Sequence, residues 1–99
     1  MEHLTEYIVE RALRGQEEDT FDTHDICFLL MNEYPAEFAR ELYACLEGGQ
    51  DPFVKLHNEL EKLLGSTYVS HFVRGLGTKR KSMNCRGKEE ECQLWEKTV

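Results

Sequence analysis

The sequence has no long apolar segment. Its longest uninterrupted apolar run, Ile26 to Met31, is far shorter than the roughly 20 residues that cross a bilayer. The first residues include Glu2, His3, Glu6 and Glu10, so they have neither the basic start nor the apolar stretch of a signal peptide. We therefore expect a cytoplasmic protein that does not contact membranes.

Motifs of the common enzyme classes are also absent. The chain has no G-x-x-x-x-G-K-[ST] loop, no G-x-S-x-G elbow, no H-E-x-x-H pair and no dinucleotide-binding glycine fingerprint. Acid pairs such as Glu17 with Glu18, or Glu89 with Glu90, lie in expected loops and turns, where water solvates them. His24 lies in the first turn of an expected helix with no nucleophile nearby, so we expect it to be solvated. We predict no catalytic residue and no enzyme activity.

Disulfide bonds are not expected either. The four cysteines have irregular spacing, and a reducing compartment keeps such thiols free. Cys27 and Cys45 fall on apolar faces of expected helices, where cysteine behaves as a small hydrophobic residue. Cys85 and Cys92 flank an expected turn and, with His71, suggest a metal site, but they lack the C-x2-4-C spacing of structural zinc sites. We predict no metal and no cofactor.

Charge is distributed unevenly along this small acidic protein. The net charge is -7, yet residues 1–66 carry 15 acidic and 5 basic residues, whereas residues 67–99 carry 4 acidic and 7 basic residues. One segment near the C-terminus has six basic residues and no acidic one: Arg74, Lys79, Arg80, Lys81, Arg86 and Lys88. Glycines at 75, 77 and 87 indicate turns, so this segment is expected to form a hairpin that contacts phosphate. Alternatively, its charges solvate an edge hairpin and discourage aggregation.

Apolar periodicity predicts two helices in the first third of the chain. The first ends at Gly15 and has Leu4, Ile8, Ala12 and Leu13 on one face. Residues 16–20 are polar and show no period, so we expect a loop. The second helix is expected to start at Asp22 as the N-cap, because Phe21 and Ile26 then form a hydrophobic staple. It should end near Tyr34, which precedes a proline.

Two further helices and a sheet are expected to follow. Pro35 starts a third helix that reaches Leu46, and the pair Asp51-Pro52 starts a fourth that ends at Gly65. The expected strands are Thr67 to Val73, Lys79 to Arg86, and Glu91 to Lys97. Trp95 either covers the core or occupies a partner's groove. The pattern predicts one α+β domain over residues 1–99, with three to four short helices (1–66) followed by a small antiparallel sheet with a basic hairpin (67–99).

This order of elements resembles a winged helix-turn-helix domain. Phe21 to Leu30 corresponds to the first helix of the motif, Asp51 to Leu64 to the recognition helix and Arg74 to Trp95 to the wing. Two departures are the extra helix from Pro35 to Leu46 and a recognition helix without net positive charge. The resemblance implies that DNA is contacted by Lys55, Asn58 and Lys62 of the recognition helix, and by Arg74, Lys79, Arg80, Lys81, Arg86 and Lys88 of the wing. In that case Asn58 reads adenine and the lysines bind phosphate.

Two functions remain open at this point. The first is a small DNA-binding transcription regulator, expected as a homodimer. The second is a non-enzymatic protein-binding module, such as an inhibitor of the phage or mobile-element type, that presents an acidic surface to a nucleic-acid-binding target. The residues of that surface are Glu17, Glu18, Asp19, Asp22 and Asp25. These acids could also simply increase solubility.

Overall fold

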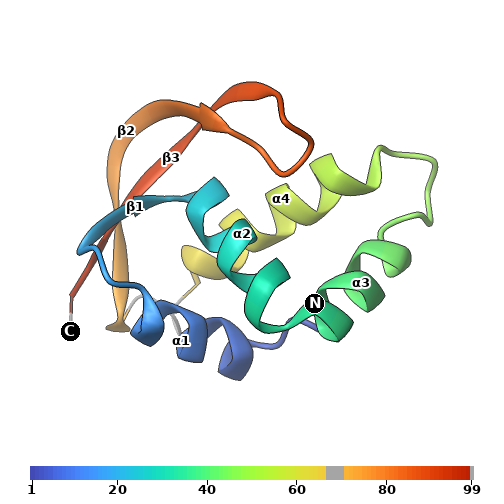
Figure 1. The fold of residues 1–99 in the computed structure, drawn as a ribbon, viewed down its shortest axis with the longest axis horizontal. Coiled ribbons are helices and arrows are strands. Elements are labelled where there is room, and N and C mark those ends of the chain that lie inside the picture. The colour runs from blue at the N-terminus through green and yellow to red at the C-terminus, as the bar shows by residue number, and fades with distance from the viewer. Residues whose placement is uncertain (67–70, 99) are drawn as a thin grey trace.

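Four helices and a three-stranded antiparallel sheet make up the described part of the chain. The computed structural model describes residues 1–66 and 71–98. The elements are α1 (Glu6–Gly15), β1 (Thr20–Asp22), α2 (Thr23–Glu33), α3 (Pro35–Ala44), α4 (Pro52–Leu64), β2 (Val73–Met83) and β3 (Glu89–Lys97). Figure 1 shows the sheet beside the helices, with the β2–β3 hairpin arching toward α4. The predicted α+β class is confirmed. None of the described helices combines the length and the apolar character needed to cross a membrane.

The predicted helix starts are confirmed by their caps. Asp22 is the N-cap of α2: its carboxylate accepts the N–H of Asp25, and the Asp25 carboxylate accepts the N–H of Asp22. This reciprocal capping box satisfies two donors that the first turn of a helix leaves unpaired. Asp51 caps α4 by accepting the N–H of Phe53. Tyr34 lies between α2 and α3, as expected for a residue that precedes proline.

The core lies between the helices and the sheet. Trp95 is only 5% exposed, so it belongs to this core and does not occupy a partner's groove. Cys27 and Cys45 are buried there as predicted. The core also contains Leu4, Val9, Ala12, Leu13, Phe21, Ile26, Leu30, Phe38, Leu56, Leu60, Leu64 and Val73. Each helix buries an apolar stripe, but that of α1 consists of Val9, Ala12 and Leu13, since Leu4 precedes the helix and Ile8 is only half-buried.

Strand β1 was not predicted. Residues 16–20 were expected to form a loop, but the chain enters a strand at Thr20, and Phe21 lies opposite Trp95 in β3. The sheet order is therefore β1-β3-β2, with both pairs antiparallel. Three residues are too few to show an alternating pattern, so only their pairing with a distant strand defines them.

The hairpin also differs from its prediction. Strand β2 begins at Val73, whereas the expected strand from Thr67 to Val73 lies partly outside the described residues, and residues 71–72 are not in a strand. β2 ends at Met83, earlier than expected, because the Asn84 side chain accepts the N–H groups of Arg86 and Lys88 and closes a turn. Strand β3 in turn begins earlier than expected, at Glu89.

Candidate functional site

The hairpin is attached to the first turn of α2 through Arg80. Its Nε lies 3.0 Å from Oδ2 of Asp22, and its Nη2 lies 2.9 Å from Oδ2 of Asp25. Arg80 stands opposite Cys92 in the β2–β3 pairing, on the face of the hairpin that meets α2. Burial raises the pKa of Asp22, but hydrogen bonds from Asp25, Ser82 and Arg80 outweigh it, so the pKa lies below its ordinary value. Asp22 therefore remains a carboxylate at neutral pH.

His24 was expected to be solvated, and this expectation is wrong. The side chain is 2% exposed, because the hairpin covers the start of α2. Its Nδ1 lies 2.7 Å from Oγ of Ser82. Of the neighbours of this hydroxyl, Asp22 can only accept, whereas Sγ of Cys92, 3.8 Å away, can donate or accept. When Ser82 donates to Asp22, its oxygen accepts from Nδ1–H of His24. The lone pair of His24 is then on Nε2.

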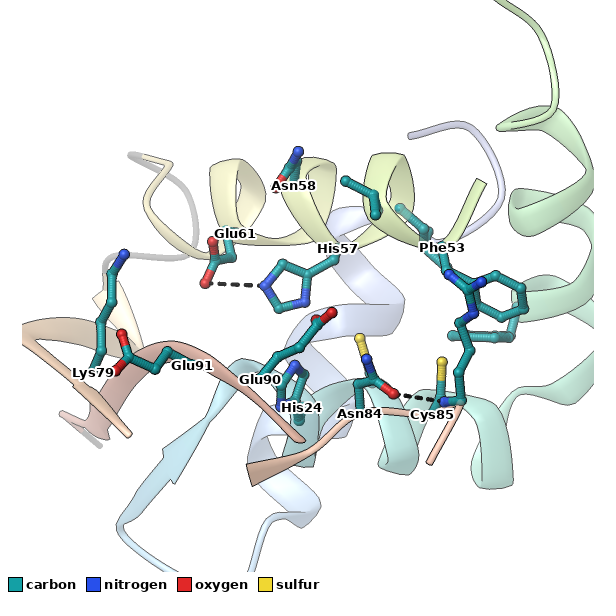
Figure 2. A pocket seen from close by; sticks show the side chains of 15 residues that line it. His24, Phe53, His57, Asn58, Glu61, Lys79, Asn84, Cys85, Glu90 and Glu91 are labelled. Atoms are coloured by element: carbon teal, nitrogen blue, oxygen red, sulfur yellow. Dashed lines mark hydrogen bonds and ion pairs between the residues drawn. The ribbon is translucent and has the colours of Figure 1, made fainter. Parts of the chain in front are cut away.

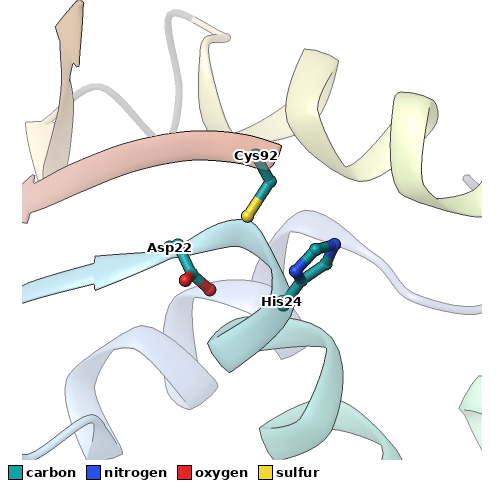
Figure 3. A group of neighbouring side chains, drawn as sticks. All are labelled: Asp22, His24 and Cys92. Atoms are coloured by element: carbon teal, nitrogen blue, oxygen red, sulfur yellow. The ribbon is translucent and has the colours of Figure 1, made fainter. Parts of the chain in front are cut away.

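Asp22, His24 and Cys92 form the one group in residues 1–66 and 71–98 whose three metal-binding atoms lie within 4.8 Å of one another. All three are buried, and Figure 3 shows them converging from β1, α2 and β3. However, both oxygens of Asp22 and Nδ1 of His24 already have hydrogen-bond partners. The guanidinium of Arg80 also supplies the positive charge there. The chemistry of this group therefore favours a structural hydrogen-bond network over a metal centre.

A groove of about 380 Å³ lies between α4, the start of α2 and the hairpin. Its polar lining includes His24, His57, Asn58, Glu61, Lys79, Asn84, Arg86, Glu90 and Glu91, and its apolar lining includes Cys27, Phe38, Phe53, Val54 and Leu56. In Figure 2, His57 points from α4 toward the hairpin, and Glu90 reaches from β3 toward the two histidines. The groove is acidic, because the carboxylates of Glu61, Glu90 and Glu91 outnumber the two cationic side chains, Lys79 and Arg86.

Two imidazoles face this groove from different elements. The ring centroids of His24 and His57 lie 5.2 Å apart with an angle of 54° between their planes. Nε2 of His24 is buried and has no hydrogen-bond partner among the described residues. Nε2 of His57 lies 3.4 Å from Oε2 of Glu61, one helical turn away. Burial lowers the pKa of His57, while Glu61 acts in the opposite direction. The i,i+4 spacing of His57 and Glu61 was the sequence signal for this pair.

Three of the six basic hairpin residues predicted to contact nucleic acid are held in ion pairs within the chain. Arg74 binds Glu96 at 2.8 Å and Arg80 binds the two aspartates of α2. Arg86 binds Asp51 at 2.6 Å and lies over the ring of Phe53. Over the described ranges, no ion pair involves Lys79, Lys81 or Lys88, and all three are exposed. The acidic run Glu89 to Glu91 is paired with residues 81–83 on the neighbouring strand.

The predicted contacts on α4 are only partly exposed to solvent. Asn58 and Lys62 are exposed, and Lys62 lies 3.5 Å from Glu59. Lys55 is half-buried, and its Nζ donates to the backbone oxygen of Glu47 at 3.4 Å. Asn58, Lys79 and Arg86 line the same groove, so the structure brings these three predicted residues together.

The predicted acidic surface is smaller than expected. Glu17, Glu18 and Asp19 are exposed, but Asp22 is fully buried and cannot contact a partner directly. Asp25 is held by Arg80 and by the N–H of Asp22. Capping and pairing therefore account for two of the five acids.

The four cysteines are free thiols. Burial raises the pKa of each, and that of Cys27 reaches about 12, so they remain protonated at neutral pH. Cys92 lies opposite Arg80 in the hairpin pairing, while Cys85 is in the turn. His71 precedes Val73, at the opposite end of the hairpin from that turn. These residues do not form the Cys85–Cys92–His71 group that the sequence suggested.

The candidate site therefore combines side chains from α2, α4 and the hairpin. Sequence reasoning missed Ser82, His57, Glu61 and Glu90, and it assigned His24 to solvent, because α4 and the hairpin meet α2 only in the folded chain. The groove is suited to cations and to hydrogen-bonding ligands, since its carboxylates and imidazoles supply lone pairs. Comparison of the chain with protein families, with characterised proteins and with solved structures finds no match.

Proposed function

We propose that this protein is a small nucleic-acid-binding regulator with a winged-helix-like fold. The observation that carries the proposal is the set of three exposed lysines, Lys79, Lys81 and Lys88, which have no ion-pair partner in the described part of the hairpin. Since no described residue forms an ion pair with these cations, they can bind phosphate without first breaking such a contact. Arg80 and Arg86 hold the hairpin on the helices, whereas Arg74 pairs with Glu96 inside the hairpin.

The topology supports this proposal. Helix α4 directly precedes β2, and a short strand, β1, follows α1 and completes the sheet in the order β1-β3-β2. This order of helices and strands is the one expected for a winged helix with one added helix, α3. Asn58 and Lys62 are exposed on α4, where a recognition helix would meet the major groove. Fold similarity alone does not establish function, so the lysines carry the argument.

The experiment is a fluorescence anisotropy titration with a labelled, sequence-random duplex at several salt concentrations. The wild type is expected to bind at low salt, and its affinity should fall as salt rises because bound phosphates release counterions. The double variant Lys79→Gln/Lys81→Gln should reduce the salt slope by about 2, or about 1 for each lost phosphate contact. A matched control, Arg11→Gln/Arg40→Gln, removes two exposed positive charges from α1 and α3 and should leave the slope unchanged.

Two results would overturn the proposal. One is no duplex binding even at low salt. The other is an equal loss of affinity in the lysine variant and in the charge-matched control, since this would show that net charge alone governs binding.

A second candidate function, binding of a protein partner, is favoured by exposed apolar side chains. Tyr43, Leu46 and Val54 are 76%, 55% and 51% exposed at the end of α3 and the start of α4. Large exposed apolar side chains at neighbouring element ends are typical of protein interfaces. If the protein does not bind the duplex, the partner protein that wild type binds should no longer bind the variant Tyr43→Ser/Leu46→Ser. The melting temperature of this variant should be unchanged.

A further inference from the structure

A buried nitrogen without a partner points into the groove. Nε2 of His24 is completely shielded in a side chain that is 2% exposed, and it makes no hydrogen bond within the described ranges. A buried polar atom that stays unpaired costs about 1–3 kcal/mol, so its presence calls for a ligand. His24 lines the groove, so an ion held there would lie beside this ring.

The partner of Nδ1 sets which atom carries the lone pair. Ser82 accepts from Nδ1–H because its own hydroxyl hydrogen goes to Asp22. Histidines that bind metals usually donate their second ring N–H in this way, which fixes the tautomer and the ring orientation. His57 has the same arrangement, since its Nε2 faces the carboxylate of Glu61 and its Nδ1 is left for a ligand.

The two rings are spaced as two ligands of one ion. Zinc lies about 2.1 Å from an imidazole nitrogen, so the centroids of two rings on a tetrahedral ion are separated by about 5 Å. The observed separation of His24 and His57 is 5.2 Å. Glu90 lines the same groove, and Figure 2 shows its side chain extending toward both rings. The ligand atoms of His24, His57 and Glu90 do not all lie within 4.8 Å of one another, so the exposed side chain of Glu90 has to rotate to complete the set.

We propose that His24, His57 and Glu90 bind one zinc ion in the groove between α2, α4 and β3. Two imidazoles and a carboxylate suit a first-row transition metal better than Mg²⁺ or Ca²⁺, which prefer oxygen ligands. The remaining position of the tetrahedron is open to water. The acidic lining, with Glu61 and Glu91 beside the site, attracts a cation. Since the three ligands come from three elements, the ion links the hairpin to the helices.

The test is metal uptake by the full chain after treatment with a chelator. Dialysis against zinc followed by elemental analysis should give one ion per chain. Titration with Co²⁺ should give the visible bands of a tetrahedral ion without the intense near-ultraviolet band of cobalt–thiolate bonds. His57→Asn and Glu90→Gln should each weaken zinc binding by at least about tenfold. Ser82→Ala, which changes only a positioning residue, should weaken it by about 10–100-fold.

Matched controls separate this site from general charge effects. Glu89→Gln removes the neighbouring carboxylate that does not line the groove, and His71→Asn removes an exposed histidine outside it. Both should bind zinc as tightly as wild type. Glu90 is exposed, so Glu90→Gln should fold. The zinc affinity of this variant therefore tests the proposal even if His57→Asn unfolds.

Three results would overturn the zinc site. They are no stoichiometric ion in the wild type, wild-type affinity in folded Glu90→Gln, or a strong thiolate band that assigns the ion to cysteines. Metal uptake is measured without nucleic acid, so its outcome is independent of duplex binding.

Discussion

Arg80 of β2 binds the carboxylate of Asp22 at the start of α2, with its Nε 3.0 Å from Oδ2, although 58 positions separate the two residues. The same carboxylate accepts the first-turn N–H of Asp25. One buried side chain thus starts a helix and attaches the hairpin to it. This relationship explains why a segment that is strongly basic in the sequence has fewer available charges in the fold.

Replacing Asp22 should destabilise the protein through both roles. Asp22→Ala removes the capping box and leaves Arg80 without its buried partner, so we expect a loss of about 2 kcal/mol in the free energy of unfolding. Urea denaturation followed by circular dichroism measures this loss. Asp51→Ala removes the exposed cap of α4 and should reduce the free energy of unfolding by less than Asp22→Ala does. An equally small effect at Asp22 would contradict the dual role.

The Asp22–Arg80 pair should also make stability depend on pH. Hydrogen bonds hold the folded-state pKa of Asp22 below its ordinary value despite burial, so the folded state binds the proton less tightly than the unfolded state. The stabilisation is therefore complete above about pH 4 and is lost as pH falls through the lower folded-state pKa. Urea unfolding over a pH series should show a steeper acid loss in wild type than in Asp22→Asn. Parallel curves would exclude this contribution.

Thr23 links three elements through one hydroxyl. Its Oγ1 accepts from the Trp95 indole N–H at 3.0 Å and donates to Oε2 of Glu61 at 2.9 Å. Thr23→Val keeps the shape but leaves the buried indole N–H unpaired, so we expect a loss of about 1–3 kcal/mol. Thr23→Ser retains the hydroxyl and is the matched control. In thermal and urea unfolding, Thr23→Val should be clearly less stable than Thr23→Ser. Equal stabilities would show that the hydroxyl contributes nothing.

Arg86 attaches the hairpin turn to the start of α4. Its guanidinium binds Asp51 and lies 5.0 Å from the ring centroid of Phe53. This guanidinium lowers the pKa of Asp51, so Arg86→Gln should return that pKa toward its ordinary value in an NMR titration. Amides of the turn should also exchange faster with solvent, while the melting temperature changes little. Lys88→Gln, close to the same turn, should change neither the pKa of Asp51 nor the amide exchange of the turn. Unchanged amide exchange in Arg86→Gln would contradict the attachment.

The helices could be predicted because their signals are local. Asp22 and Asp51 mark helix starts through hydrogen bonds to residues two or three positions away, and Pro35 marks one by occupying the first position of α3. The apolar stripes that they bury are likewise visible in the sequence. The candidate site was much less predictable, since Ser82, His24 and His57 meet only when the hairpin crosses α2 and α4.

The sequence by itself determined the starts of α2, α3 and α4, the α+β class and the uneven distribution of charge, because capping, periodicity and composition depend on neighbouring residues. The end of α3 at Ala44, before the expected Leu46, was not predicted. Only the tertiary structure decided that β1 pairs with β3, that His24 is buried, and which basic residues remain available for a partner. The pairings of Arg74, Arg80 and Arg86 connect residues 22 to 58 positions apart. Such pairings depend on the packing of whole elements, which no local pattern contains.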